Sequence, residues 1–333
     1  MIETPVTIIR GGTSRGAFFR AEDLPDAEAA RDAVLLRAFR GESGVLADGL
    51  GGEHPVLRKT AVIRPLARGA DGRPVLDYLF GQVDAELASI DRTVECGNIA
   101  SGVALFGRLC GWCAAEPVGE AWIHLANSGR RVLARWTEWT DRGGPIQLTF
   151  IDAAPATVGE ALPTGEPAHV VRAGGTSVRI SLVRGLNPYV FIDGAALGVS
   201  DPAGQGVSRE LYALLDEVEA QARALWPAPA TLKVCLVAAG DGPGVLSARI
   251  VYVGERRLHQ SFAVTGAATL ALASRIPGTV PYGGLRAGEA ASGFTIRHPE
   301  GDLQIGWSLR SDGLPAEVSL ERTCRLILRG TLY

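Results

Sequence analysis

The sequence lacks the features that mark several classes of protein. It has no run of 18 or more apolar residues, and its first residues (Met1-Ile2-Glu3-Thr4-Pro5) do not form a signal peptide, so we expect neither a membrane span nor export. The formal net charge of −3 provides no basic field for nucleic acid. Five cysteines in 333 residues are an odd number and do not form a disulfide framework, which indicates a reducing cytoplasm.

Lysine is also scarce. Lys59 and Lys233 are the only lysines among 33 basic residues. Arginine keeps its proton in proteins, whereas a desolvated lysine can act as a base near neutral pH. A lysine base therefore has two candidates. Lys59 lies near the start of a predicted strand (57–63), after a glycine-rich loop (48–55), where its side chain can face a cleft; the plainer alternative is a solvated lysine at a strand end.

The stretch 94–106 carries the strongest local signal. A strand-like segment runs into Cys96-Gly97-Asn98, and apolar residues then follow at helical spacing over 99–110. We predict a helix there, with Asn98 as its N-cap. The positive field of a helix start favours a thiolate at Cys96 and can also hold a carboxylate. An inert, buried cysteine is the alternative.

The first 20 residues predict a β-hairpin with a polar turn. Strand-like residues 6–10 and 17–19 flank Gly11-Gly12-Thr13-Ser14-Arg15-Gly16. This turn can offer two hydroxyls, backbone N–H groups and a guanidinium to a carboxylate. It does not match a P-loop, and a plain hairpin turn remains the alternative.

The second half of the sequence repeats the order of the first. Residues 182–192 again predict a strand, an Arg-Gly turn and an aromatic strand, and a long helix is predicted over 208–226. A Gly corner at Thr265-Gly266 then precedes an Ala-rich helix, with Thr265 in the place that Cys96 holds in the first half. The Pro- and Gly-rich segment 153–167 is the predicted linker.

Four stretches together resemble the PrpF family of 2-methylaconitate cis-trans isomerases, 4-oxalomesaconate tautomerases and related allylic isomerases. They are Arg10–Gly16 with Phe18-Phe19, Asp77–Val83, Cys96–Asn98, and Leu258-His259 leading to Thr265–Ala268. The resemblance covers nearly the whole chain in the same order. It implies an α/β (α+β) fold like that of diaminopimelate epimerase, with two similar domains, each a curved, mostly antiparallel sheet around a central helix. We expect domains at 1–160 plus about 315–333 and at 168–314, with the active site in the cleft between them.

The resemblance assigns the catalytic lysine to Lys59 and the catalytic cysteine to Cys96. The chain departs from the family pattern at Arg15, where the family usually has lysine, and at Glu95, where it usually has asparagine. It also departs in the segment 54–58 before Lys59, so the substrates of known members are not carried over. Thr265 in place of a second cysteine argues against a two-thiol racemase.

These observations lead to one hypothesis and its alternatives. We expect an isomerase or tautomerase, without cofactor or metal, that shifts a double bond or the cis-trans geometry in a small unsaturated di- or tricarboxylate by 1,3-proton transfer. Lys59 would be the base and Cys96 the acid. The alternatives are an epimerase or PhzF-like isomerase on the same fold, and a carboxylate-binding relative without catalysis. No nucleic acid or membrane partner is expected, and a homodimer is left open. The expected substrate-binding residues are Thr13, Ser14, Arg15, Gly97, Asn98, Asn187, Thr265, Gly266 and Ala267.

Overall fold

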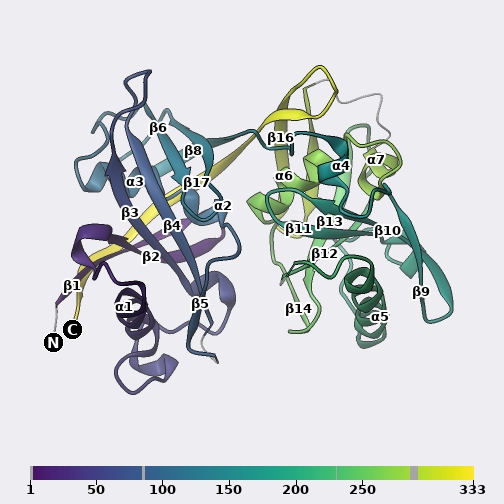
Figure 1. The fold of residues 1–333 in the computed structure, drawn as a ribbon, viewed down its shortest axis with the longest axis horizontal. Coiled ribbons are helices and arrows are strands. Elements are labelled where there is room, and N and C mark those ends of the chain that lie inside the picture. Colours follow the sequence, from purple (N-terminus) through teal and green to yellow (C-terminus); the bar gives the residue numbers. More distant parts are fainter. Residues whose placement is uncertain (1–2, 85–86, 230, 286–291) are drawn as a thin grey trace. The chain divides into compact units, whose positions relative to one another are not determined.

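The computed structural model describes residues 3–84, 87–229, 231–285 and 292–333. The chain divides into two compact units (Figure 1). The first unit is Met1–Thr149 with Glu321–Tyr333, and the second unit is Phe150–Leu320. Among the described residues, no helix is long and apolar enough to cross a membrane.

The first unit contains a sheet, one outer helix and two short inner helices. Its elements are β1 (Thr4–Gly11), β2 (Ser14–Arg20), α1 (Glu28–Arg40), β3 (Lys59–Leu66), β4 (Val75–Asp84), β5 (Ser89–Asp91), α2 (Gly97–Ala100), α3 (Val103–Leu109), β6 (Gly119–Leu125), β7 (Arg130–Trp136) and β8 (Gly143–Ile151). Short 3₁₀ turns lie at Ala21–Asp23, Leu46–Asp48 and Pro55–Leu57.

The second unit also consists of strands and helices. Its elements are α4 (Val158–Ala161), β9 (His169–Ala173), β10 (Thr176–Arg184), β11 (Pro188–Asp193), a 3₁₀ turn (Ala195–Leu197), α5 (Arg209–Leu225), β12 (Lys233–Ala239), β13 (Val245–Tyr252), β14 (Arg257–Leu258), α6 (Val264–Ala273), α7 (Val280–Leu285), β15 (Gly293–His298) and β16 (Gly301–Leu309). Strand β17 (Pro315–Leu332) begins in the second unit and continues into the first. The segment predicted as a linker, 153–167, contains α4.

Strand pairing follows the same order in both units, as the sequence repeat predicts. In the first unit β1–β2, β3–β4 and β6–β7 are antiparallel, whereas β2–β3 and β4–β6 are parallel. In the second unit β10–β11, β12–β13 and β15–β16 are antiparallel, whereas β11–β12 and β13–β15 are parallel. Each of β1 to β4 therefore has a counterpart, β10 to β13, in the other unit. The predicted fold class is confirmed.

The predicted helix over 99–110 is interrupted. The structure has α2, a turn at Ser101-Gly102, and then α3. Ser101 donates its hydroxyl to the carbonyl of Asn98 at 2.7 Å, and Gly102 N–H bonds Ile99 O in a tighter, 3₁₀-type turn. Serine and glycine both weaken a helix interior, so apolar spacing alone predicted too long a helix.

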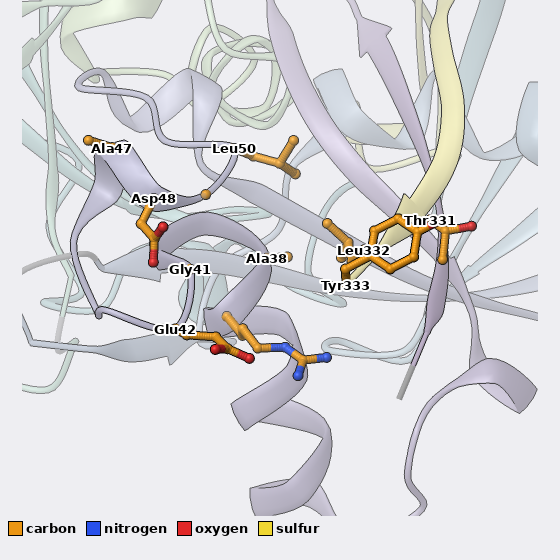
Figure 2. A pocket seen from close by; sticks show the side chains of 11 residues that line it. Ala38, Gly41, Glu42, Ala47, Asp48, Leu50, Thr331, Leu332 and Tyr333 are labelled. Atoms are coloured by element: carbon orange, nitrogen blue, oxygen red, sulfur yellow. The ribbon is translucent and has the colours of Figure 1, made fainter. Parts of the chain in front are cut away.

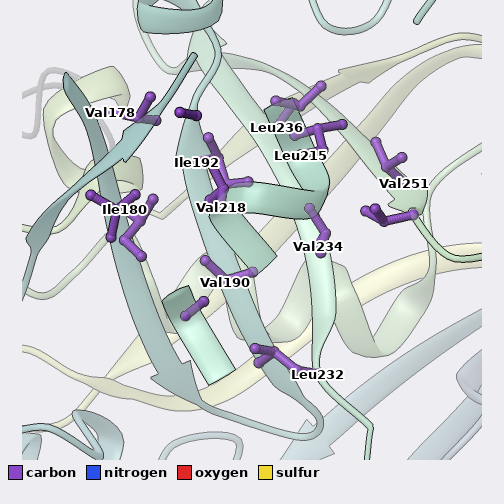
Figure 3. Packing of buried hydrophobic residues seen from close by; sticks show 14 of the residues in the cluster. Val178, Ile180, Val190, Ile192, Leu215, Val218, Leu232, Val234, Leu236 and Val251 are labelled. Carbon is purple, nitrogen blue, oxygen red and sulfur yellow. The ribbon is translucent and has the colours of Figure 1, made fainter. Parts of the chain in front are cut away.

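Each sheet is buried on both faces. In the first unit Phe18 faces Phe106 of α3, with ring centroids 5.8 Å apart, while its neighbour Phe19 joins the cluster that contains Leu35 and Phe39 of α1. In the second unit α6 is buried along its whole length, and Figure 3 shows side chains of α5 packed among residues of β10 to β13. Side chains alternate between the faces of a strand, so one hairpin contacts both an inner and an outer helix.

The hairpin turn of each unit packs directly on the inner helix. A Cβ atom at Gly11 would lie 2.2 Å from the carbonyl oxygen of Asn98, and one at Gly185 would lie 2.4 Å from Oγ1 of Thr269. Such distances leave no room for a side chain. Glycine at these two positions therefore lets the polar turns meet the helices in which the predicted site residues lie.

Candidate active site

Lys59 lies at the end of a row of side chains on one face of β4. Tyr78, Phe80 and Gln82 alternate along the strand and so share a face, and Lys59 is paired opposite Gln82. The Nζ of Lys59 donates to Oε1 of Gln82 at 2.6 Å and lies 5.2 Å from the Phe80 ring centroid. Lys59 is only 9% exposed, so the alternative of a solvated lysine at a strand end is not what the structure has.

Gln82 fixes the position of the amine. Its Nε2 donates to the carbonyl of Pro55 at 3.0 Å and to that of Arg58 at 2.8 Å. Because both amide hydrogens are used by backbone carbonyls, the amide oxygen must face Lys59. The Asp77–Val83 stretch was noted in the sequence, but Gln82 was not expected to have a role in the site.

Cys96 lies at the other end of the same row. The hydroxyl of Tyr78 donates to the carbonyl of Cys96 at 3.2 Å, and the rings of Tyr78 and Phe80 are 6.3 Å apart. Cys96 is partly exposed and is not part of a disulfide bond. The amine of Lys59 and the backbone of Cys96 thus lie at the two ends of one side-chain row within the first unit.

The predicted cap of α2 is wrong. Cys96 occupies the N-cap position and Asn98 is the second residue of the helix. The Asn98 side chain instead joins two distant segments: Nδ2 donates to Oγ1 of Thr13 at 3.2 Å, and Oδ1 accepts from Nε of Arg322 at 3.2 Å. Thr13 and Asn98 therefore meet at the start of α2, next to Gly97 in the chain.

Arg322 was not identified from the sequence. It comes from β17, 224 residues beyond Asn98, and no local motif marks it. Burial lowers the pKa of its guanidinium to about 10, because a charge is disfavoured away from water. At neutral pH Arg322 therefore remains a cation next to the Cys96 corner.

Glu95 places a second titratable group beside Cys96. It is 6% exposed, and burial raises the pKa of its carboxyl to about 7, against smaller opposing effects from Ser128, Arg130 and His124. The departure from the family pattern at this position thus puts a buried acid, half ionised near neutral pH, next to Cys96 in the chain.

Ser14 and Arg15, two of the predicted substrate-binding residues, lie against other parts of the first unit. Ser14 is buried in β2 opposite Gly11. Arg15 extends toward the loop before β3, where its Nη2 donates to the carbonyl of Leu50 at 3.4 Å. Leu50 also lines a hollow between α1, the following loop and the end of β17 (Figure 2), and none of the predicted site residues lines that hollow.

The second unit gathers the remaining predicted residues. Asn187, at the turn between β10 and β11, lies against Thr265 in the first turn of α6, followed by the buried Gly266 and Ala267. With its amide oriented to satisfy its neighbours, Asn187 donates to Leu186 O at 2.9 Å and accepts from Oγ1 of Thr265 at 2.8 Å and from Nζ of Lys233 at 3.2 Å. That both corners bind one substrate stays a prediction.

Comparisons with known proteins agree with this architecture. A family model described as PrpF protein matches residues 1–225. The chain is 30% identical to the 3-methylitaconate isomerase of Eubacterium barkeri, covering 99% of this chain and 96% of that protein. It superposes on a crystal structure of methylitaconate-delta-isomerase with a TM-score of 0.74 and 27% identity, covering 99% of this chain and 95% of that one.

A hydroxyproline epimerase from Agrobacterium vitis shares the fold at a TM-score of 0.59 and 15% identity, covering 100% of this chain and 91% of that one. The names of the curated relatives include isomerases and a tautomerase.

Proposed function

The chain belongs to the PrpF family and is an isomerase, and on this basis we propose that it moves a double bond within a small unsaturated di- or tricarboxylate by 1,3-proton transfer. Lys59 is the proposed base and Cys96 the proposed acid. Curated relatives of the chain include a 3-methylitaconate isomerase, a (4E)-oxalomesaconate Delta-isomerase and a 2-methyl-aconitate isomerase, whose names refer to acids of this class.

One observation carries the proposal: the row of Gln82, Phe80 and Tyr78 has the amine at one end and the backbone of Cys96 at the other. The Lys59 side chain is buried against the Phe80 ring, and its amine is held in place by Gln82. Arg322 and Asn98 supply positive charge and a hydrogen-bond donor set for a carboxylate at the same corner.

The proposed reaction balances without a further reagent. The C–H bond at the allylic carbon breaks and its proton goes to Nζ of Lys59, while the electron pair enters a dienolate. The proton of the Cys96 thiol then forms a C–H bond at the far carbon, and the double bond takes its new place. The ammonium and the thiolate return to their starting forms by proton exchange. Stabilisation of the dienolate by N–H groups of Gly97 and Asn98 and by Arg322 is the electrostatic part of catalysis.

The test is a screen of aconitates, itaconates and oxalomesaconate-type acids in deuterated water, followed by NMR. A substrate should gain deuterium at the carbon to which the proton returns, together with a moved double bond. For Lys59→Ala and Cys96→Ser we expect turnover to fall by a factor of about 10² to 10⁴, as for the loss of a general acid or base.

Cys110→Ser is the matched control, because Cys110 is a half-buried free cysteine of the same unit outside the proposed site. It should keep the wild-type rate. A near-normal rate in Lys59→Ala or Cys96→Ser would refute the residue assignment. Deuterium at a stereocentre without movement of a double bond would identify an epimerase instead, and binding without any exchange would identify a carboxylate-binding relative.

A further inference from the structure

The two lysines of the chain occupy the same position in the two repeats. Lys59 is the first residue of β3, which runs parallel to β2 with Lys59 opposite Gly16. Lys233 is the first residue of β12, the counterpart of β3, and runs parallel to β11 opposite Tyr189. Both of the two lysines in 333 residues thus begin equivalent strands of the two repeats.

The neighbours of Lys233 also have counterparts in the first unit. Asn187 ends the hairpin turn of the second unit as Thr13 ends that of the first, and each contacts the first turn of its inner helix. Thr265, the second residue of α6 as Asn98 is of α2, is 2% exposed and bonds Asn187. The ammonium of Lys233 lies 3.2 Å from the Asn187 oxygen, so amine, amide and hydroxyl form one cluster.

This cluster suits binding rather than proton transfer. A threonine hydroxyl is a far weaker acid than a thiol and needs an adjacent base to become a nucleophile, so Thr265 is not an equivalent of a catalytic cysteine. The contact between Lys233 and Asn187 joins a cation to a neutral acceptor. A carboxylate offered to the same ammonium makes a charge-assisted hydrogen bond, which is about twice as strong as a neutral one.

We propose that Lys233 is a specificity-determining residue that binds a carboxylate of the substrate in the second unit, together with Thr265 and Asn187. This inference rests on the proposed function for the identity of the substrate class. Binding by Lys233 makes the enzyme selective for acids with a second carboxylate beyond the one next to the reacting carbon. The second lysine then has a role distinct from that of the base.

The scarcity of lysine provides a direct test. Protein labelled with ¹³C-lysine has two lysine side chains, and the Lys59→Arg and Lys233→Arg variants assign their Cε resonances. Titration with itaconate and with trans-aconitate should shift the Lys233 resonance in a saturable way. Binding that shifts the Lys59 resonance while the Lys233 resonance stays fixed overturns the proposal, and so does the absence of any shift at Lys233 up to the solubility limit of both acids.

Steady-state kinetics provide a second test. Lys233→Met should raise KM for the diacid about 10- to 100-fold, as for loss of a hydrogen bond to a charged group, with little change for the monoester that lacks the second carboxylate. Lys233→Arg should restore part of the loss, since it keeps the charge.

An unchanged KM for the diacid in Lys233→Met refutes the inference and leaves the proposed function intact. A shifted Lys233 resonance in a protein that turns over no acid of the panel refutes the proposed function and leaves the binding role intact.

Discussion

The carboxyl group of Glu95 links the stability of the first unit to pH. Its pKa is raised from 4.5 to about 7 by burial, so the folded state binds this proton more tightly than the unfolded state. The resulting stability is fully present below pH 4.5 and is lost as the pH rises through 7. At about 1.4 kcal/mol per pKa unit, the loss is about 3 kcal/mol.

Glu95→Gln removes this titration. We therefore expect the free energy of unfolding of the variant, relative to wild type, to rise by up to about 3 kcal/mol between pH 5 and pH 8.5. Urea unfolding at several pH values measures it. Glu116→Gln, at an exposed glutamate of the same unit, should show no such trend. Parallel pH profiles for wild type and Glu95→Gln would mean that Glu95 does not titrate near neutrality.

Gly12 determines where the Asn98 side chain can lie. Its φ is +51°, and a Cβ atom there would lie 2.2 Å from Oδ1 of Asn98. Gly12→Ala should therefore destabilise the protein by more than the roughly 1–2 kcal/mol of a left-handed alanine, and it should raise KM because Asn98 must leave Thr13 and Arg322. Chemical denaturation and steady-state kinetics measure the two effects.

Gly72 offers the matched change. Its φ is +78° and no atom lies within 4 Å of the position of a Cβ, so Gly72→Ala has the backbone penalty alone. Equal losses of stability in both variants, with unchanged KM, would show that Asn98 does not depend on Gly12.

Individual site residues could be predicted from the sequence only where reactive side chains lie in short motifs. Lys59 could be identified because it follows a glycine-rich loop, and Cys96 because it directly precedes Gly97 and a helical apolar pattern; both belong to a family pattern. Arg322 could not, since it reaches Asn98 from a strand 224 residues away and is one arginine among many. The position of Lys233 became informative only once strand pairing placed it opposite β11, the counterpart of the strand β2 that Lys59 faces.

Among the elements, α5 shows how strongly one helix depends on its apolar face. Leu215 is fully buried between α5 and the sheet, so Leu215→Ala should lower the free energy of unfolding by about 2–5 kcal/mol. Leu225, in the same helix, is 42% exposed, and Leu225→Ala should lower it by less than about 1 kcal/mol. Denaturant unfolding compares them, and similar losses would contradict the packing described for this helix.

The elements were predicted well where hydrophobic periodicity is unbroken. Helix α5 was expected over 208–226 and spans Arg209–Leu225, because its apolar stripe and its Ser208 cap agree. The inner helix of the first unit was predicted too long, because the spacing of apolar residues does not show that the Ser101 hydroxyl bonds a carbonyl of its own helix. The wrong N-cap has a related cause: the Asn98 amide bonds Thr13 and Arg322 rather than the backbone N–H groups of α2.

For the whole molecule, the first unit is built from two separate pieces of the chain. Strand β1 pairs along its length with the end of β17, from Thr4 opposite Leu332 to Gly11 opposite Cys324. A chain that ends at Leu320 should therefore lose protection of first-unit amides in hydrogen exchange, while amides of β10 to β13 stay protected.

Removal of Tyr333 alone, which is 72% exposed, is the control and should change neither set of amides. Wild-type protection of β1 in the chain that ends at Leu320 would show that the first unit does not need its second piece.

This arrangement also fixes an order of events during protein synthesis. The ribosome makes β1 early, but the strand that covers its edge is made only after all 171 residues of Phe150–Leu320. The second unit is continuous and can complete its sheet while the nascent first unit still exposes an unpaired edge. The part translated first is thus completed last, and until then its open strand is the site at which the growing chain is most exposed to aggregation and to chaperones.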